Sequence, residues 1–331
     1  MAEPYEPPFS LTPAILDLVA QIAEEAGRLG LGRAGAIAPR LRRENRIRSI
    51  QASLAIENNS LSLEQVTAVV AGKRILGPAR EVLEVKNAFS AYEKLSEWKP
   101  HSSRDLLAAH GILMKGLADF AGQYRKGAVG IAKGDRIVHL APPASRVPLL
   151  MKDLLAWLRR TKVHPLVASC VFHYELEFIH PFDDGNGRIG RLWQTLILSH
   201  WKTPLAWLPV ESVIRERQAA YYEALAASDR AGQSTPFLVF LLTALRDAMV
   251  ELTPTDQVSD QVSDQVSDQV AALLKRLGSR TLGATELMAA MGLTHRPTFR
   301  KNYLTPALEG GWIERTLPNT PNSPRQKYRK R

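Results

Sequence analysis

The feature that most constrains this chain is a glycine-rich turn between two apolar segments. The turn reads Asp183-Asp-Gly-Asn-Gly187, and helical periodicity precedes it over 166–179 and follows it over 187–200. Glycines at the start of a helix let backbone N–H groups approach an anion, and the helix dipole favours negative charge there. The pattern therefore predicts a helix–turn–helix whose turn binds an anion.

Charged residues flank this turn. Arg188 and Arg191 lie three residues apart at the start of the second helix, so both can lean toward one anion, and arginine forks suit phosphate oxygens. Asp184 is a candidate Mg²⁺ ligand. His180, just before the turn, can accept a proton from an incoming hydroxyl. Together these residues favour a phosphoryl- or nucleotidyl-transfer site over a plain capped surface turn, and the Walker-type loop Gly-x4-Gly-Lys-Ser/Thr is absent from the sequence.

This segment resembles the signature of the Fic family, His-x-Phe-x-Asp/Glu-Gly-Asn-Gly-Arg-x-x-Arg. Its specified positions are all present, at His180, Phe182, Asp184, Gly185, Asn186, Gly187, Arg188 and Arg191. The resemblance implies a protein adenylyltransferase with ATP as substrate and Mg²⁺ as cofactor. Such an enzyme attaches AMP to a Ser, Thr or Tyr hydroxyl of a target protein or of itself, and pyrophosphate leaves.

The resemblance also implies the roles of the motif residues. His180 would deprotonate the hydroxyl, Asp184 would bind Mg²⁺ and Phe182 would anchor the loop in the core. The residues implied to form the anion hole for the α- and β-phosphates are Gly185, Asn186 and Gly187. Those implied to hold the outer phosphates are Arg188 and Arg191. In the related Doc branch a Lys replaces the second motif glycine and the reaction becomes phosphorylation, so Gly187 favours AMP transfer.

A second pattern lies upstream. Ser53 and Glu57 are four residues apart, on one face of a helix that we expect over 41–58, and Asn58 follows them. This resembles the inhibitory pattern Ser/Thr-x-x-x-Glu-Gly/Asn of Fic proteins and implies the class whose inhibitory helix precedes the core. A Glu57 carboxylate paired with Arg191 would occupy the arginine meant for the γ-phosphate. The plain alternative is a glutamate on a helix surface.

Periodicity predicts an all-α fold for most of the chain, a Fic-type helical core. Further helices are expected over 12–28, 62–70, 80–98, 147–158, 213–227 and 235–252. Residues 128–140 alternate around a Lys-Gly-Asp turn and predict an inserted β-hairpin, which is similar to the family's flap. Tyr221 and Tyr222 resemble a stretch that borders the adenine in relatives, although packing alone also explains them.

Basic charge is concentrated at the C-terminus. Residues 271–331 hold 12 lysines and arginines against 3 glutamates, whereas the rest of the chain is nearly neutral. Predicted helices over 285–291 and 296–309, followed by strands near 310–315 and 326–329, indicate a winged-helix (α+β) domain. The residues placed to contact DNA phosphates are Arg296, Arg300 and Lys301. A solubilising tail or a protein-binding domain is the alternative.

We therefore expect four parts: an N-terminal helical region (1–100), a catalytic core (101–253), an Asp-Gln-Val repeat (254–270) and the winged helix (271–331). The repeat favours a helix or helical linker, which could pack against a second copy or act as a spacer. The oligomeric state, a homodimer included, stays open. The longest apolar runs are too short to span a bilayer. No signal-peptide pattern is seen, and Cys170 is the only cysteine, which fits a cytoplasmic protein without a membrane partner.

Two other functions remain open on these residues. Glu57 could instead orient a water that removes AMP from a modified target. Alternatively, the core could sense nucleotide for a DNA-binding transcriptional regulator, although a pure sensor has no need of the base His180. The target protein is not readable, because a flap that pairs through its main chain carries little sequence information.

Overall fold

The computed structural model of the chain describes residues 4–31, 39–128, 130–133, 136–252, 268–278, 280–293, 295–317, 320, 323 and 326–330. It divides into two compact units, Met1–Thr253 and Pro254–Arg331. The regions expected over 1–100 and 101–253 belong to one unit with one continuous hydrophobic core. The Asp-Gln-Val repeat up to residue 267 lies outside the described residues.

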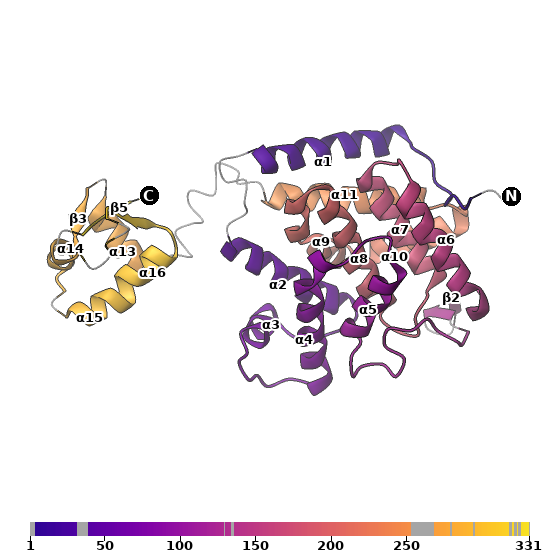
Figure 1. The fold of residues 1–331 in the computed structure, drawn as a ribbon, viewed down its shortest axis with the longest axis horizontal. Helices are drawn as coiled ribbons and strands as arrows, with labels where there is room; N and C mark the ends of the chain where they lie inside the picture. The colour runs from indigo at the N-terminus through magenta and orange to yellow at the C-terminus, as the bar shows by residue number, and fades with distance from the viewer. Residues whose placement is uncertain are drawn as a thin grey trace. The chain divides into compact units, whose positions relative to one another are not determined.

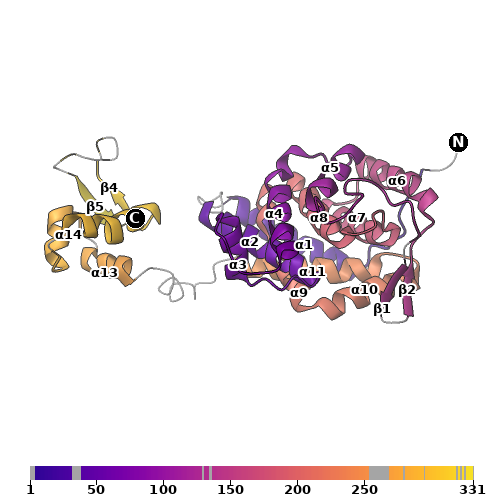
Figure 2. The same ribbon diagram turned by 90° about the horizontal axis from the view of Figure 1, so that it is seen from below.

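The larger unit is helical (Figures 1 and 2). Its main helices are α1 (Pro13–Leu31), α2 (Pro39–Ile56), α3 (Leu63–Val70), α4 (Ala79–Glu93), α5 (Ser103–Leu113), α6 (Val147–Arg160), α7 (Pro165–Ile179), α8 (Asn186–Trp201), α9 (Val210–Glu216), α10 (Gln218–Ala231) and α11 (Thr235–Leu252). Short 3-10 turns occur at Leu95–Glu97, Ala144–Arg146 and Thr203–Trp207. Within the described residues, no helix is long and apolar enough to cross a membrane.

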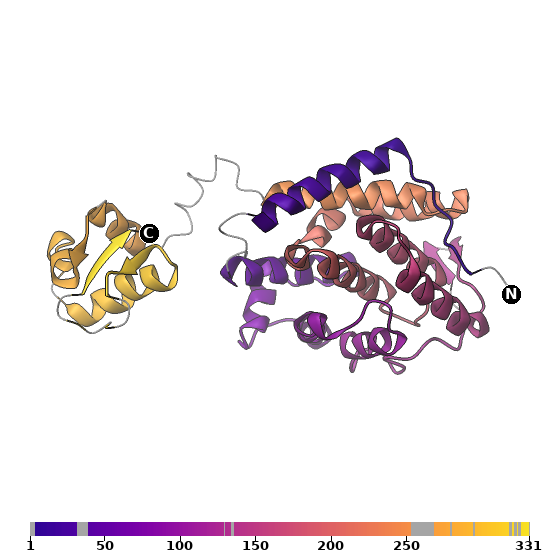
Figure 3. The same cartoon turned by 45° about the horizontal axis from the view of Figure 1, so that its top comes forward.

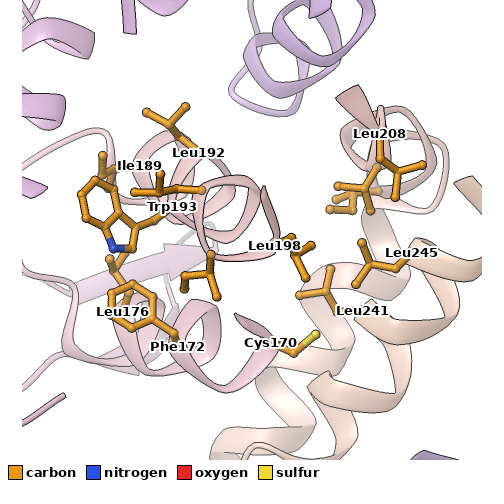
Figure 4. Packing of buried hydrophobic residues seen from close by; sticks show 14 of the residues in the cluster. Cys170, Phe172, Leu176, Ile189, Leu192, Trp193, Leu198, Leu208, Leu241 and Leu245 are labelled. Atoms are coloured by element: carbon orange, nitrogen blue, oxygen red, sulfur yellow. The ribbon is translucent and has the colours of Figure 1, made fainter. Parts of the chain in front are cut away.

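Helices α7 and α8 form the centre of this unit. They pack against each other, and α11 packs against α7 and runs beside α1 (Figure 3). Every residue of α8 from Arg188 to Leu198 is buried. Figure 4 shows part of this core, with Phe172 and Cys170 contributed by α7, Trp193 by α8 and Leu245 by α11. A helix buried all round gives its N-terminal turns a rigid base, and those turns carry the motif arginines.

Most of the predicted helices are confirmed, with three corrections. The helix expected over 80–98 is too long, because α4 ends at Glu93 and a 3-10 turn follows at Leu95–Glu97. The single helix expected over 213–227 is wrong, because α9 ends at Glu216, α10 begins at Gln218 and Arg217 lies between them. The helix α5 was not predicted, since its apolar residues give only a weak helical pattern and Gly111 interrupts them. It is held in place by its cap, where Ser102 accepts a hydrogen bond from the Asp105 N–H.

The predicted hairpin is confirmed as an antiparallel pair. Strand β1 (Gly130–Lys133) pairs with β2 (Arg136–Leu140), with an irregularity in register between Ile131 and Ala132. Strand β2 contacts α10. The hairpin therefore contacts the helical core through β2.

The smaller unit combines helices with a three-stranded sheet. Its elements are α13 (Asp268–Leu277), β3 (Leu282–Gly283), α14 (Ala284–Ala290), α15 (Arg296–Phe299), a π-helical turn at Arg300–Leu304, α16 (Thr305–Glu309), β4 (Ile313–Arg315) and β5 (Lys327–Lys330). The strand order is β3-β5-β4, and both pairings are antiparallel. The short strand β3 was not predicted. The helix expected over 285–291 is α14, and the helix expected over 296–309 is α15 and α16 with a π-helical turn between them. The core of this unit includes Leu273, Leu287, Phe299 and Tyr328.

The core of the larger unit allows a matched test of packing. Leu245 on α11 is fully buried, whereas Leu16 on α1 is 54% exposed. We expect Leu245→Ala to lower the free energy of unfolding by about 2–5 kcal/mol, because it removes buried methyl groups and leaves a cavity. Leu16→Ala makes the same chemical change at the surface and should cost less than about 0.5 kcal/mol. Urea denaturation followed by circular dichroism checks both values, and equal losses would contradict this description of the core.

Candidate active site

The turn between α7 and α8 is held in an unusual backbone conformation. His180 ends α7 with φ 50°, one of two non-glycine residues with positive φ among those described, and its N–H still donates to Leu176 O. A left-handed conformation at a non-glycine residue costs of order 1–3 kcal/mol and persists only when its surroundings enforce it. The conformation turns the chain sharply, so that the signature loop folds back toward α8.

Arg125 supplies part of that enforcement. Its side chain is 2% exposed, and its guanidinium donates to His180 O (2.7 Å), Ile179 O (3.3 Å) and Pro142 O (2.5 Å). Its backbone N–H donates to Pro181 O at 2.9 Å. The buried cation therefore caps the C-terminus of α7, where carbonyls lack partners within the helix. It also ties the turn to the residue that follows the hairpin.

His110 and Phe182 anchor the turn from the inside. The two rings stack at 3.7 Å, and Phe182 is fully buried, in accord with the predicted anchor. Gly122 N–H donates to His110 Nδ1 at 2.9 Å, so Nδ1 carries no proton and Nε2–H donates to Asp184 O at 2.9 Å. Burial lowers the pKa of His110 to about 4, which keeps the ring neutral.

Two of the residues predicted to bind phosphate also shape the turn. The Asn186 carboxamide accepts from Phe182 N at 3.0 Å and donates to Phe182 O at 2.8 Å, so its remaining contribution to an anion is its backbone N–H. Gly185 has φ 85°, and a Cβ there would lie 2.6 Å from Met114 Sδ. Only glycine fits this position, both sterically and in backbone conformation.

The predicted contact between the upstream glutamate and the second motif arginine is present. Arg191 is 1% exposed and donates from Nη2 to Glu57 Oε1 at 2.7 Å and from Nε to Ser53 Oγ at 2.9 Å. Burial alone would lower the pKa of Arg191, but Glu57, Tyr221 and Glu177 together outweigh burial and the pKa is raised. A Cβ at Gly187 would collide with Glu57 Oε1. The carboxylate therefore lies directly against the first turn of α8, where a helix favours an anion.

The end of α2 explains how Glu57 reaches this place. Asn58 adopts φ 68°, Asn58 N–H donates to Ala55 O, and Asn59 N–H donates to Leu54 O. These two bonds form a Schellman motif in which Glu57 is the capping residue and Asn58 takes the left-handed position. The motif accounts for asparagine after the glutamate, because few other residues adopt this conformation readily.

The first motif arginine is also paired with carboxylates. Arg188 is 7% exposed, and its Nη2 donates to Asp184 Oδ1 at 2.8 Å. Its Nη1 lies 3.5 Å from Glu84 Oε1 on α4. Arg80, one turn earlier on α4, lies 3.7 Å from Asp184 Oδ2. The predicted metal ligand therefore belongs to a cluster of two arginines and two carboxylates.

The remaining predicted residues differ in exposure. Tyr221 is 2% exposed and its hydroxyl bonds His173 Nε2 at 3.1 Å, so its ring packs in the core, whereas Tyr222 is 46% exposed. In the smaller unit Arg296 and Arg300 are exposed, and the side chain of Lys301 lies outside the described part of the structure.

Sequence reasoning missed Arg125, His110 and Glu84. Each contacts the signature from a helix or loop far away in the chain. A lone arginine, histidine or glutamate at such a distance carries no local signal.

The buried, neutral His110 ring predicts that the free energy of unfolding falls as the pH is lowered. His110 takes up a proton near pH 6.5 in the unfolded chain but only near pH 4 in the folded chain. Acidification therefore destabilises the fold, and this residue contributes about 2 kcal/mol of that loss at pH 5. We expect His110→Gln to reduce by that amount the fall in unfolding free energy between pH 7.5 and pH 5, as measured by urea denaturation. His173, whose pKa burial lowers to about 3, remains in both proteins and contributes equally. An unchanged pH dependence would contradict the neutral, buried state of His110.

Two protein-family models match the chain, one in each of its two units. Residues 100–198 match the model of the Fic/DOC family, and residues 268–330 match the model described as "Filamentation induced by cAMP protein Fic-like, C-terminal domain". The chain is 32% identical over 215 residues to protein adenylyltransferase fic-1 of Caenorhabditis elegans, covering 61% of this chain and 40% of that protein. It is 27% identical over 213 residues to protein adenylyltransferase Fic of Drosophila erecta. The chain thus spans about 40% of the length of these curated relatives.

Solved structures resemble the whole chain more fully. A Fic family protein from Desulfovibrio desulfuricans G20 is 59% identical, with a TM-score of 0.74 over 99% of this chain and 98% of that one. A fragment of Fic-1 from Caenorhabditis elegans shares the fold at 23% identity, with a TM-score of 0.60 over 76% of this chain and 74% of that one. The signature geometry, the family match over 100–198 and the full-length relative agree, and the chain belongs to the Fic family.

Proposed function

We propose that this chain is a protein adenylyltransferase, which transfers AMP from ATP to a hydroxyl of a target protein or of itself. The observation that carries the proposal is the pair of buried arginines, Arg188 and Arg191, in the first two turns of a helix capped by Gly185. Arg188 is paired with the carboxylates of Asp184 and Glu84, and Arg191 is paired with the carboxylate of Glu57 and also donates to Ser53. A triphosphate offers the same charge to the same donors. The adenylyltransferase names of the curated relatives support this activity.

The chemistry assigned to the chain's own residues is a single displacement at the α-phosphorus. His180 accepts the proton of the target hydroxyl, whose oxygen forms a bond to the α-phosphorus. The bond from the α-phosphorus to the bridging oxygen breaks, and that oxygen leaves with pyrophosphate. Arg188 and Arg191 neutralise the leaving phosphates, and the missing Cβ at Gly187 leaves room for them beside α8.

Asp184 is the residue that would hold Mg²⁺. Its side chain is 47% exposed and its carboxylate faces the start of α8, so it can bind a metal that also binds phosphate oxygens, as Mg²⁺ prefers. The ion would supply charge neutralisation to the phosphates. In the structure this carboxylate is paired with Arg188.

The hairpin would align the target segment. Antiparallel pairing between β1 and β2, together with the contact of β2 with α10, supports a role for a free strand edge in main-chain pairing with a peptide. The exposed ring of Tyr222 is the proposed contact for adenine.

Glu57 restrains this activity in the proposal. Its carboxylate occupies Arg191 and the space against Gly187, so a triphosphate must displace it to reach the buried guanidinium. Replacement of one partner of a buried ion pair by another anion costs less than leaving the arginine unpaired. Nucleotide can therefore displace Glu57 from Arg191 without unfolding of the site.

Removal of the carboxylate tests the brake. We expect Glu57→Gly to raise AMP incorporation into the protein itself or into lysate proteins by at least about tenfold, since more than about 1.4 kcal/mol of competition at Arg191 is lost. His180→Ala should abolish incorporation by removing the base. Incorporation is measured with α-phosphate-labelled ATP.

The matched control is Glu64→Gly, which removes an exposed carboxylate from the neighbouring helix α3. It should leave incorporation at the wild-type level. Equal labelling of wild type, Glu57→Gly and His180→Ala would sink the scheme. Release of AMP from a modified target that requires Glu57 would instead identify an enzyme that removes AMP.

The smaller unit carries a second candidate function, binding of DNA. Its elements follow the order helix, strand, two helices and two strands, which is the order of a winged helix. Arg296 and Arg300 are exposed on the segment after the turn at Gly292. The final strand adds exposed Arg329 and Lys330. Such basic placement suits phosphate contacts on a duplex.

Salt dependence tests this second function. We expect the full chain to bind duplex DNA, and the double variant Arg296→Ala/Arg300→Ala to lower the slope of log affinity against log salt by about 2. Fluorescence anisotropy with labelled DNA at several salt concentrations measures the slope. Arg230→Ala, which removes an exposed arginine of the larger unit, should leave it unchanged. Identical slopes for all three proteins would contradict DNA binding through this helix.

A further inference from the structure

Helix α4 brings a second carboxylate to the phosphate arginines. Glu84 is 12% exposed at its side chain, and its Oε1 lies 3.5 Å from Arg188 Nη1. Arg188 is itself only 7% exposed, so this pair is shielded from water far more than an ordinary surface ion pair. Arg80 lies 3.8 Å from the same Glu84 oxygen, but it is 60% exposed and so contributes little. The partner of Glu84 that matters is therefore Arg188.

The other oxygen of Glu84 is held by the turn that carries Glu57. Asn59 Nδ2 donates to Glu84 Oε2 at 2.8 Å and to Glu81 O at 3.3 Å, and Asn59 Oδ1 accepts from Leu61 N at 3.1 Å. Asn59 is 8% exposed, and its own N–H closes the Schellman motif at the end of α2. Its side-chain amide is thus fixed on both sides, and it holds Glu84 in one place.

Residues 57–59 therefore reach both motif arginines at once. Glu57 contacts Arg191 directly, and Asn59, two residues later, reaches Arg188 through Glu84. Asn58 stands between them in the left-handed conformation that sets their relative directions. A displacement of this turn that frees Arg191 also removes the support of Glu84.

We propose that Glu84 is a positioning residue for Arg188 and that, through Asn59, it forms the second arm of the restraint that Glu57 places on Arg191. This inference rests on the proposed function and deepens it. In the structure Arg191 is paired with Glu57, and Arg188 is paired with Glu84 as well as with Asp184 of the signature, so a carboxylate from the N-terminal region reaches each arginine. Binding of a triphosphate releases the two carboxylates together, because one turn of the chain supports both.

The test is nucleotide binding in a protein that cannot turn over. In a His180→Ala background, Glu84→Gln keeps the size of the side chain but removes its charge. We expect the Kd for Mg²⁺–ATP, measured by titration calorimetry, to fall by at least about threefold. Glu81→Gln is the matched control, since Glu81 lies one turn earlier on α4 and accepts from Ser60 on the same turn but touches neither arginine. Its Kd should stay within about twofold of the parent.

The same titration tests whether the Glu57–Arg191 and Glu84–Arg188 contacts depend on each other. When Glu57→Gly is added, the turn is already released, so the effect of Glu84→Gln on Kd should shrink toward onefold. Three outcomes would each overturn the inference: a rise in Kd with Glu84→Gln, an equal fall in Kd with Glu81→Gln, or an effect of Glu84→Gln on Kd that is as large with Glu57→Gly as without it. If the protein that combines His180→Ala with Glu57→Gly fails to bind ATP, the proposed function itself fails, whatever Glu84 does.

Discussion

The buried guanidinium of Arg191 is the group on which the rest of the site depends. An arginine that is 1% exposed has lost its hydration, and only an anion of good geometry compensates for that loss. The core around α8 fixes where the guanidinium lies, so the anion must come to it. In this structure Glu57 fills that role, with Ser53 completing the hydrogen bonds. On the proposed function a phosphate fills it during the reaction, and regulation becomes an exchange of anions at a fixed cation.

A fixed cation requires a fixed turn, and the signature provides only part of one. Phe182 and Asn186 belong to the signature and hold the loop by burial and by paired hydrogen bonds. Arg125 and His110 come from elsewhere and saturate the carbonyls of His180 and Asp184. These contacts set the backbone before any nucleotide arrives, so the binding free energy need not order the loop. The strained φ of His180 is one cost of that preorganisation.

The sequence was sufficient for local features and insufficient for distant ones. The signature, the Glu57–Arg191 pair and the hairpin follow from spacing along the chain or from the family pattern, and the structure places them as expected. Helix α5 escaped notice because a glycine and a weak apolar pattern hide it, and His110 was hidden with it. Glu84 meets Arg188 through the tertiary packing of α4, which contacts α2, α3 and α5, and no periodicity of the sequence encodes that packing. The interruption of the helix at Arg217, between α9 and α10, is likewise set by tertiary packing rather than by local helix propensity.

On the proposed function, the position of Glu57 also explains how one residue would restrain activity without disturbing the fold. The carboxylate directly follows the C-terminus of α2, where the helix dipole disfavours negative charge, and it lies against the N-terminus of α8, where the dipole favours it. Its stability therefore comes from α8 and Arg191 and not from its own helix. A triphosphate carries more charge than one carboxylate and gains more from the same helix terminus. The proposed restraint would then hold Arg191 without nucleotide and yield to a triphosphate, provided that both arginines change partners together.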